Sequence, residues 1–145
     1  MKPMLPEGTA APAFTLQDHS GNSVSLENFR GSKNVVLIFY PGDLTPGCTK
    51  QLCEIKDEYS KFKSSNTVVF GVNPAGGESH ANFVKKKFLP FPLLVDEGGR
   101  VAQAYDCKGM IATKRTVYVI DKNGVITLAR EGKPPVPEIL SGIKN

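Results

Sequence analysis

The longest unbroken run of hydrophobic residues in the chain covers positions 35–40, with the sequence VVLIFY. The run is rich in β-branched and aromatic residues and is followed by the turn-forming stretch 41–47. Such a run predicts a strand that is buried on both faces of a sheet. Residues 67–72 repeat the pattern, and the shorter run 93–95 predicts a third strand.

A helical pattern begins directly after the turn-forming stretch. Apolar residues recur there at spacings of three and four, with lysines and acidic residues between them: Leu52, Ile55, Tyr59 and Phe62. This periodicity predicts one helix from about Cys48 to Lys63, so that Cys48 lies at or near its N-terminus. Shorter helices are expected at 78–88 and 100–105, and a last helix with proline in its first turn is expected near Pro135.

Two hairpins complete the predicted elements. Residues 13–17 and 23–26 alternate in the strand manner around a turn, which predicts an N-terminal β-hairpin. Residues 115–120 and 125–129 flank an Asn-Gly turn and predict a second hairpin. The order of strands and helices predicts an α/β fold with a mixed central sheet flanked by helices. Without repeats or a long linker, residues 1–145 are expected to form a single domain.

Composition narrows the class of protein. The chain has 145 residues, of which 40% are hydrophobic, and this suits one domain with a sizeable core. The net charge of +4 is mild and evenly spread, which argues against nucleic acid as a partner. No run approaches the roughly 20 apolar residues of a membrane helix. The first ten residues do not resemble a signal peptide, and three cysteines do not suggest a secreted disulfide framework, so we expect a cytoplasmic location.

The position of Cys48 has a chemical consequence. The first turn of a helix has unpaired N–H groups and a partial positive charge, and both favour a thiolate over a thiol. A thiolate is the species that peroxides oxidise, and a second thiol such as Cys53 can then close a disulfide. The alternative is that Cys48 is only a small buried hydrophobic residue at a helix start.

The residues around Cys48 match a known pattern. Pro41-x-x-x-Thr45-x-x-Cys48 is the active-site pattern of peroxiredoxins, and the stretch FYPGDLTPGCTKQLC closely resembles the peroxiredoxin Q subgroup, also called bacterioferritin comigratory proteins. The resemblance runs from about Gly8 to Gly124 and more loosely beyond. Many relatives carry glutamate three residues after the first cysteine, where this chain has Gln51.

The resemblance implies a thioredoxin-like fold and a thiol-dependent peroxidase that reduces hydrogen peroxide and organic hydroperoxides. It implies that Cys48 becomes a sulfenic acid and then forms an intramolecular disulfide with Cys53. It also implies that Thr45 supplies a hydroxyl, that Pro41 shields the pocket and that Arg115 lies beside the sulfur. No cofactor or metal is expected; thioredoxin or a similar dithiol would be the reductant, and the protein would be a monomer.

Two other functions use the same residues. A thioredoxin-like thiol–disulfide oxidoreductase needs the same fold, but such enzymes use C-x-x-C, whereas Cys48 and Cys53 are separated by four residues. They also carry a cis-proline at the position that Arg115 occupies. A zinc or iron–sulfur module would need further ligands, and only Cys107 and the scattered histidines remain. We expect His19 to lie in a turn, His80 on the surface, and Cys107 to be an inert thiol.

Overall fold

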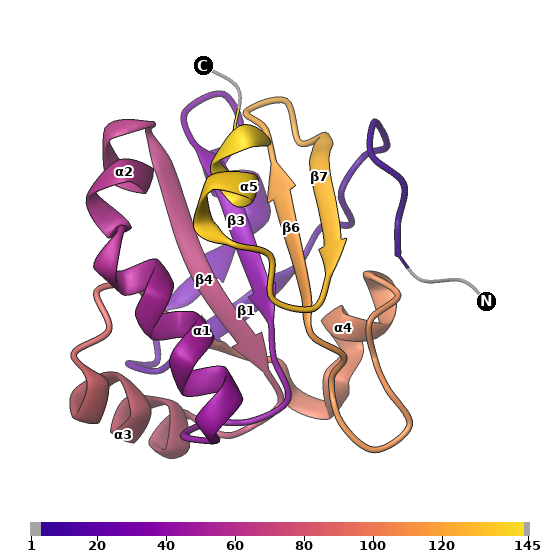
Figure 1. The fold of residues 1–145 in the computed structure, drawn as a ribbon. Helices are drawn as coiled ribbons and strands as arrows, with labels where there is room; N and C mark the ends of the chain where they lie inside the picture. Colours follow the sequence, from indigo (N-terminus) through magenta and orange to yellow (C-terminus); the bar gives the residue numbers. More distant parts are fainter. Residues whose placement is uncertain (1–3, 144–145) are drawn as a thin grey trace.

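The computed structural model describes residues 4–143, and Cys48 by its backbone alone. Seven strands form one mixed sheet in the order β2-β1-β5-β4-β3-β6-β7 (Figure 1). The strands are β1 (Thr15–Asp18), β2 (Ser23–Ser25), β3 (Asn34–Phe39), β4 (Thr67–Asn73), β5 (Leu93–Val95), β6 (Thr116–Ile120) and β7 (Ile126–Glu131). Strands β3, β4 and β5 are parallel, whereas β6 runs antiparallel to β3. The expected mixed sheet and both hairpins are therefore confirmed.

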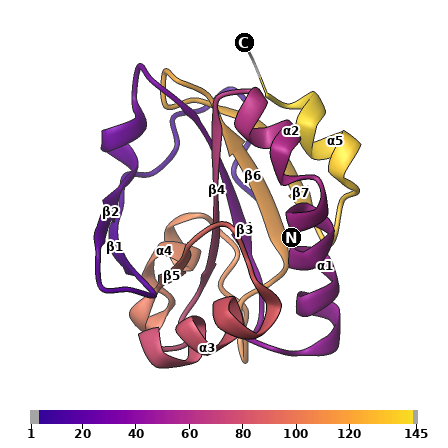
Figure 2. The same ribbon diagram turned by 90° about the vertical axis from the view of Figure 1, so that its left-hand side faces the viewer.

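Helices lie on both sides of the sheet. They are α1 (Pro46–Asp57), α2 (Tyr59–Ser64), α3 (Gly77–Lys87), α4 (Arg100–Ala104) and α5 (Val136–Ser141), with short 3-10 turns η1 (Leu26–Phe29) and η2 (Glu97–Gly99). Figure 2 shows α1, α2 and α5 on one face, with α4 and the β1–β2 hairpin on the other side. In the part of the chain that the structure describes, no helix is long and apolar enough to cross a membrane.

Strand β3 separates two hydrophobic clusters. Val36 and Ile38 belong to the cluster under α1, α2, α3 and α5, whereas Val35, Leu37 and Phe39 belong to the cluster on the opposite face. All six residues of β3 are buried, which confirms the prediction of a strand enclosed on both faces. The end of β3 is consequently a rigid point from which the next loop starts.

The prediction of one helix from Cys48 to Lys63 is wrong. Helix α1 ends at Asp57, and α2 begins at Tyr59 after Glu58, whose backbone is non-helical with φ −111° and ψ 18°. Ile55 before the break and Phe62 after it are both buried in the same cluster. The apolar spacing therefore continues across the break, and neither glycine nor proline marks it in the sequence.

A glycine in β4 makes room for the residue that follows β3. A Cβ atom on Gly71 would lie 2.6 Å from Leu93 Cδ2 and 3.1 Å from Tyr40 Cε1. Both neighbours are fully buried, so neither has free space to move into. Gly71 thus allows the Tyr40 ring to pack against β4 at the point where the chain leaves the sheet.

We expect Gly71→Ala to lower the free energy of unfolding by about 1–3 kcal/mol, because the added methyl group overpacks a closed part of the core. Urea denaturation measures the change. Gly77→Ala is the matched control: a Cβ there meets only the His19 carbonyl oxygen at 3.9 Å, and alanine favours the helix. Equal stability of the two variants would contradict the close packing around Tyr40.

Candidate active site

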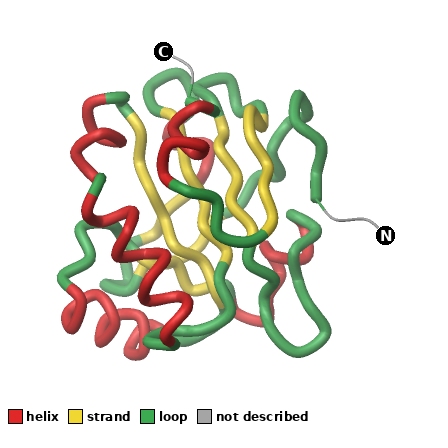
Figure 3. The backbone as a smooth tube through the Cα atoms, viewed as in Figure 1, coloured by secondary structure: helices red, strands yellow, loops and turns green. Residues whose placement is uncertain are grey.

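The loop between β3 and α1 brings the predicted motif to one end of the sheet, as Figure 3 shows. Thr45 is the N-cap residue of α1, and its carbonyl oxygen accepts a hydrogen bond from the Thr49 N–H at 2.8 Å. Pro46 is the first helical residue, where its missing N–H costs nothing. The Thr45 hydroxyl donates to the Gly42 carbonyl oxygen at 3.2 Å instead of capping the helix.

Cys48 is the third residue of α1, as the sequence predicted for a cysteine at a helix N-terminus. The backbone N–H groups of the first turn have no partner within the helix, and they favour a negative charge at this end. The side chain of Cys48 lies outside the described atoms. The site is therefore defined here by the groups that surround the first turn of α1.

Arg115 lies directly against that turn. Its Nη2 atom is 2.6 Å, and its Cζ atom 3.4 Å, from the point where a Cβ on Gly47 would stand. Any larger residue at position 47 would displace the guanidinium, so the glycine brings it next to the backbone that precedes Cys48. Arg115 Nη1 is buried and has no hydrogen-bond partner among the described residues. This atom is a free donor in a site that favours anions.

A buried carboxylate holds the middle of the loop. Asp43 Oδ1 accepts a hydrogen bond from the Tyr40 hydroxyl at 2.6 Å. Asp43 Oδ2 accepts another from the Ser79 hydroxyl at 2.6 Å and lies 2.7 Å from His80 Nδ1. The Asp43 side chain is 4% exposed and that of His80 is 0% exposed. We call these four residues the Asp43 network; it joins the loop to helix α3.

The burial of His80 corrects the expectation that it lies on the surface. Its second ring nitrogen, Nε2, is 2.9 Å from the Leu94 carbonyl oxygen. Both nitrogens therefore face acceptors, and the ring satisfies both only when both carry a proton. His80, Phe83 and Val84 are spaced as one helix face, so the apolar periodicity of α3 contained a signal for this burial.

The hydrogen bonds decide the charge of Asp43. Burial by itself would raise the pKa of this carboxyl group, but the contacts from His80, Ser79 and Tyr40 outweigh it and lower the pKa below 3.8. Asp43 is therefore a carboxylate at neutral pH. A shielded carboxylate of this kind holds its hydrogen-bond partners strongly, because the loss of a partner leaves a buried polar group uncompensated.

The other two cysteines differ in their surroundings. Cys53 is a partly exposed free thiol on α1, the helix that also contains Cys48. Cys107 is fully buried in the cluster opposite α1, and burial raises the pKa of its thiol to about 12. Such a thiol is unreactive at neutral pH.

Gln51 occupies an interior position one helical turn after Gly47. It is 2% exposed, and neither its amide oxygen nor its nitrogen has a partner among the described residues. A neutral side chain therefore lies where a carboxylate would have reduced the positive charge of the site. No group of three His, Cys, Asp or Glu side chains in the described part of the chain is arranged to hold a metal ion.

A comparison with protein-family models matches residues 8–129 to the AhpC/TSA family. The chain belongs to this family and is a peroxiredoxin. Peroxiredoxin Q, chloroplastic, of Sedum lineare is 48% identical over 126 residues, which cover 84% of this chain and 67% of that protein. The protein of the same name from Arabidopsis thaliana is 46% identical over 125 residues, or 84% of this chain and 57% of the relative. The chain thus spans little more than half of several curated relatives.

Solved structures agree with the fold. The peroxidoxin BcpB of Mycobacterium tuberculosis has a TM-score of 0.90 at 27% identity, and the alignment covers 96% of both chains. A Xylella fastidiosa PrxQ variant has a TM-score of 0.88 at 24% identity, with 94% of both chains covered. The thioredoxin-like peroxiredoxin fold is therefore confirmed.

The expected cytoplasmic location is contradicted. The relatives from Sedum lineare, Oryza sativa and Arabidopsis thaliana are all named chloroplastic, and none of these names places the relative in the cytoplasm. The expectation rested on composition and on the first residues of the chain. Neither the composition nor these first residues identify a compartment, because proteins of different aqueous compartments inside a cell have similar surfaces.

We expect Asp43→Asn to lower the free energy of unfolding at pH 7 by about 2–3 kcal/mol, because it leaves the buried His80 without its anionic partner. The folded-state pKa of Asp43 lies below 3.8, so its contribution is complete above that value and is lost as the pH falls through the lowered pKa. The difference from wild type should therefore be constant well above pH 3.8 and should shrink as the pH falls below it.

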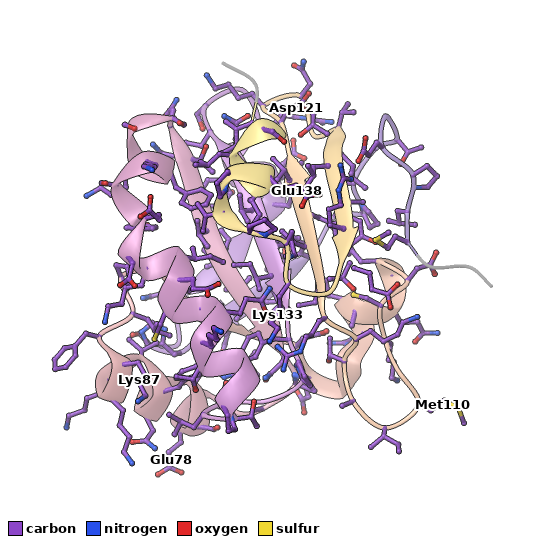
Figure 4. All side chains as sticks on the ribbon, in the orientation of Figure 1. Glu78, Lys87, Met110, Asp121, Lys133 and Glu138 are labelled. Atoms are coloured by element: carbon purple, nitrogen blue, oxygen red, sulfur yellow. The ribbon has the colours of Figure 1, made fainter. Side chains whose placement is uncertain are left out.

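Urea denaturation at several pH values measures this difference. Glu78→Gln, at the exposed start of α3 (Figure 4), removes the same charge without touching the Asp43 network and should change stability by about 0.5 kcal/mol or less. A pH-independent difference for Asp43→Asn, or an equal effect of the two variants, would show that Asp43 is not held as a paired carboxylate.

Proposed function

We propose that the protein reduces hydrogen peroxide and organic hydroperoxides with Cys48 as the peroxidatic nucleophile. The Cys48 thiolate attacks one peroxide oxygen, the O–O bond breaks, and the second oxygen takes up a proton and leaves as water or an alcohol. Cys48 is oxidised to a sulfenic acid in this step. The observation that carries the proposal is the Arg115 guanidinium packed against Gly47, at the helix N-terminus that bears Cys48.

The groups around α1 suit the charge that develops in this reaction. Negative charge moves from sulfur along the O–O bond, and donors fixed at that place stabilise the transition state more than the ground state. We assign this role to Arg115, whose buried Nη1 has no other partner among the described residues, and to the first backbone N–H groups of α1. Thr45 would turn its hydroxyl from Gly42 to the peroxide, and Pro41 would shield the pocket from water.

We propose that Cys53 then condenses with the sulfenic acid, releasing water and forming a Cys48–Cys53 disulfide. Both residues lie on α1, where a spacing of five positions along the helix puts their Cα atoms roughly 8.6 Å apart. A disulfide requires Cα atoms within about 7 Å and converging Cβ atoms. The first turns of α1 must therefore unwind before the bond can form.

The backbone of the loop supports a proposal for where this unwinding stops. Leu44 has a positive φ of 60°, a conformation that is unfavourable for a leucine. It lies between Asp43, which is tied to α3, and the exposed Thr45, whose bonds to other described residues stay within the loop and the first turn of α1. We propose that Leu44 is the joint at which the unwinding segment meets the fixed part of the loop.

A dithiol protein of the thioredoxin type would return the disulfide to two thiols and so complete the cycle. The proposal for this partner rests on family membership, since peroxiredoxins use reductants of this type. A monomer suffices for this catalytic cycle, because both proposed redox cysteines are on one helix of one chain.

We expect Cys48→Ser to abolish peroxide consumption in an assay with thioredoxin and its reductase, because a hydroxyl group does not replace the thiolate. Cys53→Ser should complete one oxidation and then stop with a sulfenic acid, which a dimedone label detects by mass spectrometry. Cys107→Ala is the control and should keep turnover. Near wild-type turnover in Cys48→Ser would refute the proposed nucleophile; full turnover in Cys53→Ser would refute the resolving step.

We expect hydrogen exchange to differ between the reduced and disulfide forms along residues 49–55, whose N–H groups bond within α1. These amides should be protected in the reduced protein, where α1 is intact, and should exchange faster in the oxidised protein, where it has unwound. The amides of β3 provide the control and should stay equally protected in both forms. Equal protection of α1 in both forms would mean that Cys48 and Cys53 do not pair.

A further inference from the structure

A second cation lies at the same helix start. Lys133 is on the connection between β7 and α5, and Figure 4 shows it beside α1. The preceding residue, Gly132, donates its N–H to the Arg115 carbonyl oxygen at 2.8 Å, which ties this connection to the backbone of Arg115 itself. Pro134 and Pro135 follow and restrict the backbone of Lys133 to extended conformations.

Lys133 and Arg115 converge on Gly47. From the point where a Cβ on Gly47 would stand, Lys133 Nζ is 3.8 Å away and Arg115 Nη2 is 2.6 Å away. The distance between Lys133 Nζ and Arg115 Nη2 is therefore no greater than the sum of these two distances. Two positive charges are thus held close together at the positive end of a helix. Like charges at this separation repel each other, and an anion between or beside them offsets that repulsion.

Neither Arg115 nor Lys133 forms an ion pair with a carboxylate among the described residues. The first turn of α1 contains no acidic residue, and Gln51, one turn further, is neutral. Glu7 and Glu138, which flank β7 and α5, both pair with Arg130. A thiolate at Cys48 would balance one of the two cations, and one positive charge would remain at the entrance to the site.

We propose that Lys133 is a specificity-determining residue that favours hydroperoxides carrying a carboxylate group. This inference rests on the proposed function, since it names a substrate class for the same site. The guanidinium and the helix N-terminus serve the peroxide group, which is common to all substrates, whereas the ammonium is left for a second, anionic group. Because Lys133 is exposed, the preference is moderate and weakens with salt.

The test compares a hydroperoxide acid with its own ester. Suitable substrates are 4-hydroperoxy-4-methylpentanoate and its methyl ester, with hydrogen peroxide as a third substrate. The quantity measured is the ratio of the second-order rate constants for Cys48 oxidation by the acid and by the ester. A change that affects only the thiolate alters both rates equally and leaves this ratio unchanged.

We expect Lys133→Met to lower the acid-to-ester ratio about three- to fivefold, and Lys133→Glu to lower it further. Lys133→Arg should keep the ratio near that of the wild type because it keeps the charge. Raising the salt concentration to about 0.5 M should lower the wild-type ratio towards that of Lys133→Met. Lys63→Met removes the same charge from α2, which Figure 1 shows at the far end from the start of α1, and should leave the ratio unchanged.

Failure of the peroxidase activity and failure of the specificity role of Lys133 give different results. If the wild-type protein reduces none of the three peroxides, the proposed function fails. If it reduces hydrogen peroxide and the ester, but the ratio is the same in wild type and Lys133→Met, the specificity role of Lys133 is refuted alone. An equal drop in Lys63→Met would also refute it, because net charge would then explain the preference.

Discussion

The carboxylate of Asp43 fixes the active-site loop to the end of β3, to α3 and, through His80, to β5. It binds the Tyr40 hydroxyl at the end of the central strand, and it binds Ser79 and His80 on α3. The ring of His80 in turn reaches the backbone of β5 through Leu94. Because the carboxylate and the ring are both shielded from water, the contacts are stronger than equivalent contacts on a surface and more costly to break. The start of α1 is therefore held by its preceding loop as well as by its own packing.

This anchoring matters because the proposed chemistry makes opposite demands on α1. An intact first turn directs N–H groups towards Cys48 and keeps Arg115 against Gly47, which suits the attack on peroxide. A disulfide between Cys48 and Cys53 requires the same turn to unwind. A loop fixed at Asp43 and strained at Leu44 would confine the proposed rearrangement to a short segment, so that the sheet and α3 need not change.

The positive charges around the start of α1 come from segments outside that helix. Arg115 directly precedes β6, and Lys133 lies on the connection after β7, yet the two strands pair and bring both residues to Gly47. Gln51 adds no negative charge to this group. The site is thus more positive than a reading of α1 alone would indicate, since that helix contributes only its dipole to the place where Cys48 lies.

Local patterns in the sequence were enough to predict β3 as a doubly buried strand, the loop after it, and Cys48 at the start of a helix. Each depends on neighbouring residues: hydrophobic periodicity, turn formers and the dipole of a single helix. The break at Glu58 was not predictable, because the spacing from Ile55 to Phe62 continues through it. The pairs Asp43–His80 and Gly47–Arg115, and the position of Lys133, are contacts between residues far apart in the chain. Only the order of the strands and the packing of α3 against the sheet bring them together, and periodicity contains no information on either.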